Sequence, residues 1–387
     1  MTKQIFDVII VADFRFPGGT SSAVAAEIRA LRQGGYSVAL YQINAPILTN
    51  IERWNDRITG LVDAGDAVVL PADSEASCRV LLIHSPWLFV EAPKQRPRIE
   101  SSLNVLVAHH TPTDARGRLN YDAVLVEHNA SKAFGGPVVW APISPVCRES
   151  FIDAGLTQIC LRHDWTNVVF VDDWGRARTR FTGEIPVVGR HSRPQLEKWP
   201  AKRADLLAMY PVDSNIVVKL LGVGEKVRAL MEPFPDHWVI WEFNQIPVRD
   251  FLAEIDFFVY FHHPDWIETF GLTIAEAAAA GCVVITHPYL EKTFGKAALY
   301  CSPEGAPALV ETISQEPHYF AELSAQGRAT VDDKFGPEAY LRRFQRLHAA
   351  SQDQALLTDL VFQPERSARL WLRRGAKRSA YWARSGL

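Results

Sequence analysis

The sequence has few cysteines, no long hydrophobic run and no short-period repeat. Its five cysteines are an odd number and include no C-x-x-C pair, so neither a disulfide framework nor a zinc site is expected, and a reducing cytosol is the simplest location. The apolar run near the N-terminus meets charges at Asp7 and Asp13, and no other stretch approaches the roughly 20 apolar residues of a membrane-spanning helix. We therefore expect a soluble, cytoplasmic protein without a signal peptide.

Positive charge is concentrated at the C-terminal end. The 387-residue chain has a net charge of −3, but residues 365–387 carry seven Arg or Lys and one Glu, which leaves −9 on the rest. Trp371 and Trp382 lie among these basic residues, so the segment has two interpretations: a terminal helix packed on the first domain, or a peripheral contact with anionic lipid at the inner membrane face. The acidic remainder and the lack of a recognition motif argue against nucleic acid as a partner.

Short apolar runs alternate with helical patterns along the chain. This alternation is typical of α/β proteins, whose parallel strands are buried on both faces. The first expected strand, a helix over 23–33 and the next strand form a right-handed βαβ unit. Strands are expected at 6–14, 36–43, 66–70, 79–84, 103–109, 122–127, 137–142, 185–190, 215–222, 238–243, 256–263, 282–287 and 297–302.

A charged, turn-rich stretch at 172–184 separates two such series. It predicts two doubly wound domains, at 1–181 and 182–349, followed by a helical basic tail at 350–387. In open parallel sheets, ligands bind beyond the carboxyl ends of the strands. We therefore expect the site in a cleft between the two domains.

A glycine-rich turn follows the first expected strand. Gly18 and Gly19 would let backbone N–H groups approach a phosphate at a helix N-terminus. The alternative is a plain turn in which Thr20 or Ser21 caps the helix. The turn lacks the G-x-G-x-x-G pattern, so a nicotinamide-dependent dehydrogenase is not expected.

Two glutamates flank the start of an Ala-rich helix in the second half. Glu268 lies in the loop before the helix, and Glu276 lies within it, seven residues intervening. Carboxylates accept hydrogen bonds from sugar hydroxyls, and free helix N-terminal amides donate to phosphate. The alternative is that Glu276 forms a capping box with Thr273 and only satisfies the helix end. The residues between the two glutamates that would meet a ligand are Phe270, Gly271, Leu272 and Thr273.

The segment from Glu268 to Gly281, E-T-F-G-L-T-I-A-E-A-A-A-A-G, resembles the signature of retaining GT-B glycosyltransferases of the family 4 type, also called glycosyl transferases group 1. These enzymes use nucleotide-sugar donors. The resemblance implies a GT-B fold of two Rossmann-like domains facing a central cleft. It also implies that Glu268 binds hydroxyls of the donor sugar, that residues 270–273 face the sugar and diphosphate, and that Glu276 binds the ribose hydroxyls.

The resemblance extends to basic residues after the first strand of the second domain. The family places an Arg there and a Lys about five residues later, and these cations neutralise the diphosphate. Here Arg190 and Lys198 are eight residues apart, whereas Arg193 and Lys198 have the usual spacing but a different alignment, so the choice of arginine stays open. Such cations stabilise the charge that develops on the leaving group. Gly18 and Gly19 match the family's diphosphate loop.

Two histidines end the expected strand at 103–109. The family often places a histidine there that contacts the donor sugar near its reactive carbon, which favours His109, with His110 as the substitute and His84 as a second candidate. His262 and His263 lack the H-x-x-x-H spacing of a zinc site. The resemblance implies that neither a metal nor another cofactor is needed.

The expected activity is transfer of a sugar from a nucleoside-diphosphate sugar to a hydroxyl of a glycan, a lipid-linked acceptor or a small molecule. No residue stands out as a covalent nucleophile, so the resemblance implies a same-face reaction in which the leaving phosphate helps to deprotonate the acceptor. Two alternatives stay open. One is a nucleotide-sugar epimerase of the same architecture, and the other is a non-catalytic subunit that binds a sugar nucleotide.

Overall fold

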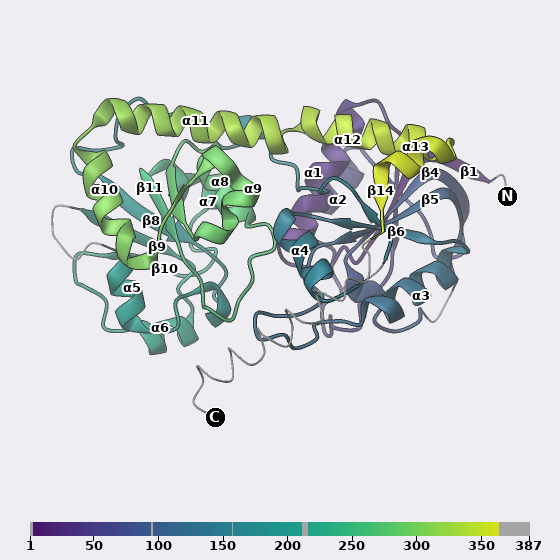
Figure 1. Cartoon of the computed structure of the whole chain (residues 1–387), viewed down its shortest axis with the longest axis horizontal. Coiled ribbons are helices and arrows are strands. Elements are labelled where there is room, and N and C mark those ends of the chain that lie inside the picture. Colours follow the sequence, from purple (N-terminus) through teal and green to yellow (C-terminus); the bar gives the residue numbers. More distant parts are fainter. Residues whose placement is uncertain (1–2, 94–95, 157, 211–215, 364–387) are drawn as a thin grey trace. The chain divides into compact units, whose positions relative to one another are not determined.

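The computed structural model describes residues 3–93, 96–156, 158–210 and 216–363, and the chain divides into two compact units (Figure 1). Unit 1 consists of the described residues within Met1–Thr113, Gly117–Trp165 and Phe344–Leu387. Unit 2 consists of those within Asp114–Arg116 and Thr166–Arg343. The predicted basic segment at 365–387 lies outside the described residues. Within the described ranges, no helix is both long and apolar enough to cross a membrane.

Unit 1 is built on an eight-stranded sheet in the described residues, in the order β14-β7-β6-β5-β4-β1-β2-β3. All neighbouring strands are parallel except β14, which pairs antiparallel with β7. The order reverses direction between β1 and β4, as expected of a doubly wound sheet. The strands are β1 Gln4–Ala12, β2 Val38–Gln42, β3 Val68–Val69, β4 Glu75–His84, β5 Arg98–Ala108, β6 Val138–Pro142, β7 Cys160–Leu161 and β14 Val361–Phe362.

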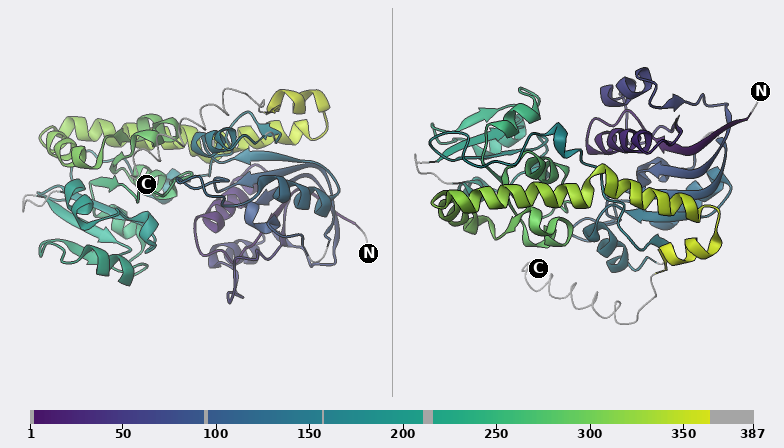
Figure 2. Two further views of the ribbon diagram at one scale, coloured as in Figure 1. Left: turned by 60° about the horizontal axis from the view of Figure 1, so that its bottom comes forward. Right: turned by 90° about the horizontal axis from the view of Figure 1, so that it is seen from above.

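Helices lie on both faces of this sheet (Figure 2), which explains why Val8 to Ala12 of β1 are all buried. The helices of unit 1 are α1 Gly19–Gln33, α2 Asp56–Asp63, α3 Ala123–Phe134, α4 Pro145–Asp153 and α13 Gln354–Leu360, with a 3-10 turn at Pro86–Phe89. Helix α12, Pro337–Ala350, contains the point at which the chain returns to unit 1.

The predicted strand at 122–127 is wrong, because these residues begin helix α3. The Asp122 side chain accepts hydrogen bonds from the N–H groups of Val124 and Leu125 and so caps the helix. Gly135 ends it in the left-handed conformation. The buried positions follow a three-to-four-residue spacing, which leaves Val124 and Leu125 exposed. A short apolar run fits a strand or a helix, and here the cap decides.

Unit 2 contains a six-stranded parallel sheet in the described residues, in the order β10-β9-β8-β11-β12-β13. This is the strand order of the Rossmann fold, with the reversal between β8 and β11. Figure 1 shows α5 and α6 on one side of the sheet and α7 and α8 on the other. The strands are β8 Val187–His191, β9 Val217–Leu221, β10 Val239–Trp241, β11 Phe257–Tyr260, β12 Val283–Thr286 and β13 Leu299–Tyr300.

The helices of unit 2 include α11, which packs against α8. The α-helices of unit 2 in the described residues are α5 Arg203–Met209, α6 Glu225–Met231, α7 Val248–Ala253, α8 Leu272–Ala279, α9 Glu291–Phe294, α10 Ala306–Ser314 and α11 Pro317–Phe335. Short 3-10 turns lie at Val171–Asp173, Leu196–Lys198, Pro288–Leu290, Gly295–Ala297 and Pro303–Gly305. The two doubly wound sheets confirm the predicted fold class.

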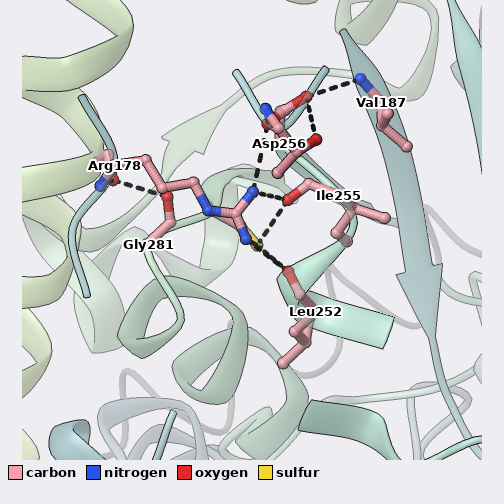
Figure 3. A network of polar contacts seen from close by, with 9 residues as sticks. Arg178, Val187, Leu252, Ile255, Asp256 and Gly281 are labelled. Carbon is pink, nitrogen blue, oxygen red and sulfur yellow. Dashed lines mark hydrogen bonds and ion pairs between the residues drawn. The ribbon is translucent and has the colours of Figure 1, made fainter. Parts of the chain in front are cut away.

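The division between the units falls after Trp165, earlier than the predicted boundary at 181. The segment between these points is tied to unit 2 by the buried carboxylate of Asp256 (Figure 3). Asp256 forms an ion pair with Arg178 at 3.3 Å and accepts hydrogen bonds from the N–H groups of Thr182 and Val187. Arg178 also donates to the carbonyl groups of Ile255 and Leu252 (Figure 3). Charge and turn residues indicated a linker here, but these contacts make it part of unit 2.

Replacing Asp256 by alanine is expected to lower the free energy of unfolding by about 3–5 kcal/mol, because the largely buried Arg178 loses its counter-ion. Asp172→Ala is the matched control, since its carboxylate pairs with Arg328 but is 95% exposed, and it should cost less than about 1 kcal/mol. Urea unfolding of both variants measures the difference. Equal losses would show that Asp256 contributes no more than a surface pair.

Candidate functional site

The reversal point of the unit 2 sheet brings two loops together. Arg190 lies near the carboxyl end of β8, and Lys198 lies in the loop that follows this strand. The loop after the neighbouring β11 carries Glu268 and leads into α8. In open α/β sheets, ligands bind beyond the carboxyl ends of the strands at such a reversal point. The candidate residues from both sequence motifs therefore lie at the same edge of one sheet.

Arg190 is fully buried. Its guanidinium donates hydrogen bonds to the carbonyl oxygens of Phe261 and Lys198 and lies over the rings of Trp199 and Tyr260, at 4.3 and 4.7 Å from their centroids. These contacts hold the loop after β8 against the loop after β11. Arg190 is thus positioned to fix the Lys198 backbone.

Arg193 differs from Arg190 in its exposure. Its side chain is exposed, and its backbone carbonyl accepts a hydrogen bond from the indole N–H of Trp199. Its charge helps to lower the pKa of Lys198, after the larger effect of burial. Of the two arginines between which the sequence left the choice open, Arg193 is the one with an accessible guanidinium.

Lys198 and Glu268 form a buried ion pair. The Lys198 ammonium lies 2.6 Å from Glu268 Oε2, and the hydroxyl of Tyr260 donates to the same oxygen at 2.9 Å. Burial alone would raise the pKa of Glu268, but the Lys198 cation and these hydrogen bonds outweigh it and lower the pKa. Glu268 is therefore ionised at neutral pH, and its carboxylate is an acceptor for hydroxyl groups.

A second layer of side chains holds the backbone of Glu268. The hydroxyl of Tyr289 accepts a hydrogen bond from the Glu268 N–H at 3.0 Å and lies 2.6 Å from His262 Nε2. Nε2 of His287 accepts from the His262 N–H. Burial lowers the pKa of His262 to about 4 and that of His287 to about 3, so both are neutral. The sequence motifs did not indicate Tyr260 or Tyr289. Tyr260 is the last residue of β11, and Tyr289 lies in the 3-10 turn that follows the adjacent strand β12, so their positions after expected strands were the available signal.

Helix α8 begins without a side-chain cap. Its N-cap is Gly271, whose φ of 86° favours glycine, and a Cβ there would lie 3.2 Å from Glu268 Cγ. The Thr273 hydroxyl is buried and forms no hydrogen bond within the described ranges, so the alternative interpretation, a capping box with Glu276, does not hold. The first N–H groups of a helix have no carbonyl partner within it, and an uncapped helix start of this kind suits an anion. The roles of Leu272 and Thr273 in binding a ligand stay a prediction.

Phe270 precedes the start of helix α8, and Glu276 lies within the helix. The Phe270 side chain is buried and packs on Phe294 and Phe335, so it belongs to the core. Glu276 lies one turn into α8, with Oε2 at 3.8 Å from Nε2 of His191. Burial, with Arg190 nearby, lowers the pKa of His191 to about 3. Glu276 therefore faces a neutral ring at the end of β8, and helix α8 places it at the same strand ends as Glu268.

In unit 1, the predicted glycine loop follows β1 and starts α1. Gly18 is the N-cap, no side chain caps the helix, and the Ser21 hydroxyl donates to the carbonyl of Phe16. Thr20 and Ser21 are therefore not caps. A Cβ on Gly19 would meet no atom within 4 Å, so protein packing does not require glycine there. The loop presents helix N-terminal amides at the reversal point of the unit 1 sheet.

Two of the candidate histidines lie at the ends of the neighbouring strands β4 and β5 of unit 1. His84 ends β4 and His109 follows β5, and their rings meet with Nδ1 of His84 at 3.0 Å from Nε2 of His109. Burial, then the charges of His84 and His110, lower the pKa of His109 well below its usual range. The ring of His110 lies against Trp87. The structure thus brings His84 and His109 together, and His109 is neutral at physiological pH.

No group of three or more His, Cys, Asp or Glu side chains in the described ranges is arranged to hold a metal ion. His262, His263 and Asp265 do not form such a group. Nδ1 of His263 lies 3.6 Å from Oδ2 of Asp265, whereas Nε2 of His262 is hydrogen-bonded to the Tyr289 hydroxyl.

Neither protein-family models nor curated proteins match this sequence. Solved structures do match its fold. HepE of Anabaena, in complex with UDP and glucose, has a TM-score of 0.60 and 12% identity over 89% of this chain and 100% of its own. A glycosyltransferase from Rickettsia africae has a TM-score of 0.61 and 13% identity, over 91% and 100%. WaaG, a glycosyltransferase of lipopolysaccharide biosynthesis, has a TM-score of 0.51 and 13% identity, over 86% and 97%. The fold is therefore that of the GT-B glycosyltransferases.

Proposed function

We propose that this protein is a retaining glycosyltransferase of the family 4 type that moves a sugar from a nucleoside-diphosphate sugar to an acceptor hydroxyl. The observation that carries the proposal is the set of groups at the unit 2 reversal point: an ionised buried glutamate, a lysine paired with it and an uncapped helix N-terminus. Acceptors for sugar hydroxyls and donors for phosphate are what such a donor requires. Neighbours with the same fold include one solved with UDP and glucose.

Each group has a role in this proposal. The diphosphate binds the first-turn amides of α8, with Lys198 and the exposed Arg193 as cations, while Arg190 positions Lys198. Glu268 accepts hydrogen bonds from sugar hydroxyls, and Glu276 accepts from the ribose. As the glycosidic bond breaks, negative charge grows on the leaving phosphate, and the fixed cations and amides stabilise it.

The reaction we infer needs no metal and no covalent intermediate. The leaving phosphate helps to deprotonate the acceptor hydroxyl on the same face of the sugar, which retains the configuration. His109, neutral and anchored at the end of β5, contacts the sugar near its reactive carbon, with Gly18 and Gly19 near the diphosphate. Glycans, lipid-linked molecules and small molecules are the acceptor classes, and the proposed location is the cytoplasm, with a peripheral contact at the inner membrane face as a further option.

Replacing Glu276 by alanine is expected to lower kcat/KM for the donor about 10- to 200-fold, equivalent to about 1.5–3 kcal/mol for a lost charged hydrogen bond. The KM for the donor should rise, because the ribose is bound in both ground and transition states. Glu311→Ala, on the exposed face of α10, is the matched control and should leave the kinetics unchanged. Normal donor kinetics in the Glu276 variant would remove this residue from the site.

A donor panel tests the function. UDP-, GDP- and ADP-sugars are each mixed with the protein, and thermal stability, nucleotide release and sugar products are measured with and without glycan acceptors. A ligand that binds the native state raises the melting temperature. We expect one nucleotide class to do so and to release nucleoside diphosphate with a new, retained glycosidic bond. A changed sugar nucleotide formed without acceptor would indicate the epimerase, and binding without any turnover would indicate the non-catalytic subunit.

A further inference from the structure

A buried histidine at the end of β8 has a ring nitrogen without a hydrogen-bond partner. His191 is the last residue of β8 and is 5% exposed. Within the described ranges, its Nε2 atom forms no hydrogen bond. Burying a polar atom without a partner is costly, and nearly all such atoms in native proteins are paired. Nε2 of His191 therefore indicates a partner that is not part of the described chain.

The strand pairing places His191 at the reversal point of the unit 2 sheet. β8 pairs with β11 at Val188 and Gly189. It pairs with β9 as far as His191, which lies opposite Leu221. His191 thus extends beyond these pairs with β11, at the strand ends where ligands of open α/β sheets bind. The proposed donor site lies at the same edge of the sheet.

The neighbours of His191 are two aromatic rings and one carboxylate. The centroid of its ring lies 6.1 Å from that of Phe251 on α7 and 5.4 Å from that of Phe258 on β11. Nε2 lies 3.8 Å from Oε2 of Glu276 on α8, beyond the roughly 3.2 Å limit of a hydrogen bond. The two rings pack on the imidazole, and its Nε2 lies beside the carboxylate without bonding it.

A hydroxyl group suits this pair of atoms. Burial, with the charge of Arg190 as the smaller cause, lowers the pKa of His191 to about 3, so the ring is neutral at physiological pH. A neutral imidazole nitrogen bonds a hydroxyl whether it carries the proton or a lone pair, because a hydroxyl both donates and accepts. The carboxylate of Glu276 accepts from hydroxyls too, but it repels an anion such as phosphate. Adjacent ribose hydroxyls present two such groups side by side.

We propose that His191 is a further donor-binding residue, which binds a ribose hydroxyl through Nε2 beside the one bound by Glu276. The inference rests on the proposed function and adds a contact to the same site. It makes His191 a determinant of specificity, because a site that bonds a hydroxyl discriminates against the analogue that lacks it. The histidine therefore favours a ribonucleotide over the corresponding deoxy form.

Replacing His191 by phenylalanine, combined with deoxy nucleotides, tests this contact. The probe is whichever of UDP, GDP and ADP gives the largest thermal shift with the full-length protein, together with its 2′-deoxy and 3′-deoxy forms. Isothermal titration calorimetry measures each Kd. The variant should bind the ribonucleotide about 3- to 10-fold more weakly, the scale of one neutral hydrogen bond. The deoxy form that lacks the hydroxyl on His191 should bind the variant and the wild type equally, whereas the other should weaken as the ribonucleotide does.

His318→Phe is the matched control, because His318 is an exposed histidine of α11 in the same unit, and it should leave every Kd unchanged. If His191→Phe does not fold, His191→Leu removes the ring nitrogen with a smaller side chain. Equal weakening of the ribonucleotide and both deoxy forms, or no weakening of any, would overturn the inference and leave the proposed function standing. Failure of the wild type to bind any of the three nucleotides would reject both.

Discussion

Replacing Lys198 by methionine is expected to lower kcat by roughly 100- to 1000-fold, the scale seen when one preorganised group that stabilises developing charge is removed. The same change leaves the buried carboxylate of Glu268 with the Tyr260 hydroxyl but no counter-ion, and should lower the free energy of unfolding by about 3–5 kcal/mol. Steady-state kinetics and urea unfolding measure the two effects separately.

The two effects can be separated by a second substitution. In Lys198→Met with Glu268→Gln, the neutral amide no longer needs a counter-ion, so much of the stability should return while activity stays low. Lys219→Met is the matched control, since Lys219 pairs with Glu254 in the same unit at 2.7 Å but the partner is half exposed. It should leave kcat unchanged. Recovery of activity together with stability in the double variant would contradict a role for Lys198 in transfer.

Unit 2 is expected to lose stability steeply between pH 6.5 and 4.5. His191 and His262 are buried and His287 is partly buried, and all three are neutral, with pKa values lowered to about 3, 4 and 3. In this range the unfolded chain therefore binds protons that the folded chain does not. Stability therefore falls as pH falls, with a slope that approaches about 1.4 kcal/mol per pH unit for each histidine once the unfolded ring is fully protonated, or roughly 7 kcal/mol over these two units for all three. That is comparable with the whole stability of a typical domain.

Hydrogen exchange of the amides in β8, β11 and β12, measured at several pH values, reports this loss for unit 2 alone. His287→Gln should remove about one third of the slope, whereas His318→Gln, on the exposed face of α11, should not alter it. A flat profile from pH 6.5 to 4.5 would show that these histidines take up protons in the folded state. The lowered pKa of Glu268 acts in the same direction, but only below about pH 4.5, where the unfolded carboxyl is protonated.

The sequence predicts the fold correctly where the spacing of apolar residues distinguishes a strand from a helix. Runs such as 256–263 are apolar on both faces because helices cover both sides of the sheet, and they proved to be strands. The run at 122–127 predicts a strand but begins a helix, because its length fits either element and the Asp122 cap decides between them. The two-residue strand β7 has no pattern long enough to read, since it is defined only by its partners β6 and β14.

The candidate site was predictable as a set of residues but not as a set of contacts. The motif indicated Glu268 and Lys198, and the structure places them 2.6 Å apart. Spacing could not show that Arg190 is enclosed by aromatic rings while Arg193 is exposed, because burial depends on distant residues such as Tyr260.

The most direct measurement is a crystal structure of the protein with the nucleoside diphosphate that gives the largest thermal shift. The account predicts the diphosphate at the N-terminus of α8, with phosphate oxygens on the amides of Leu272 and Thr273 and within ion-pair distance of Lys198, and the ribose hydroxyls on Glu276. A nucleotide bound elsewhere, with this crevice empty, would contradict the central claim that the unit 2 reversal point is the donor site.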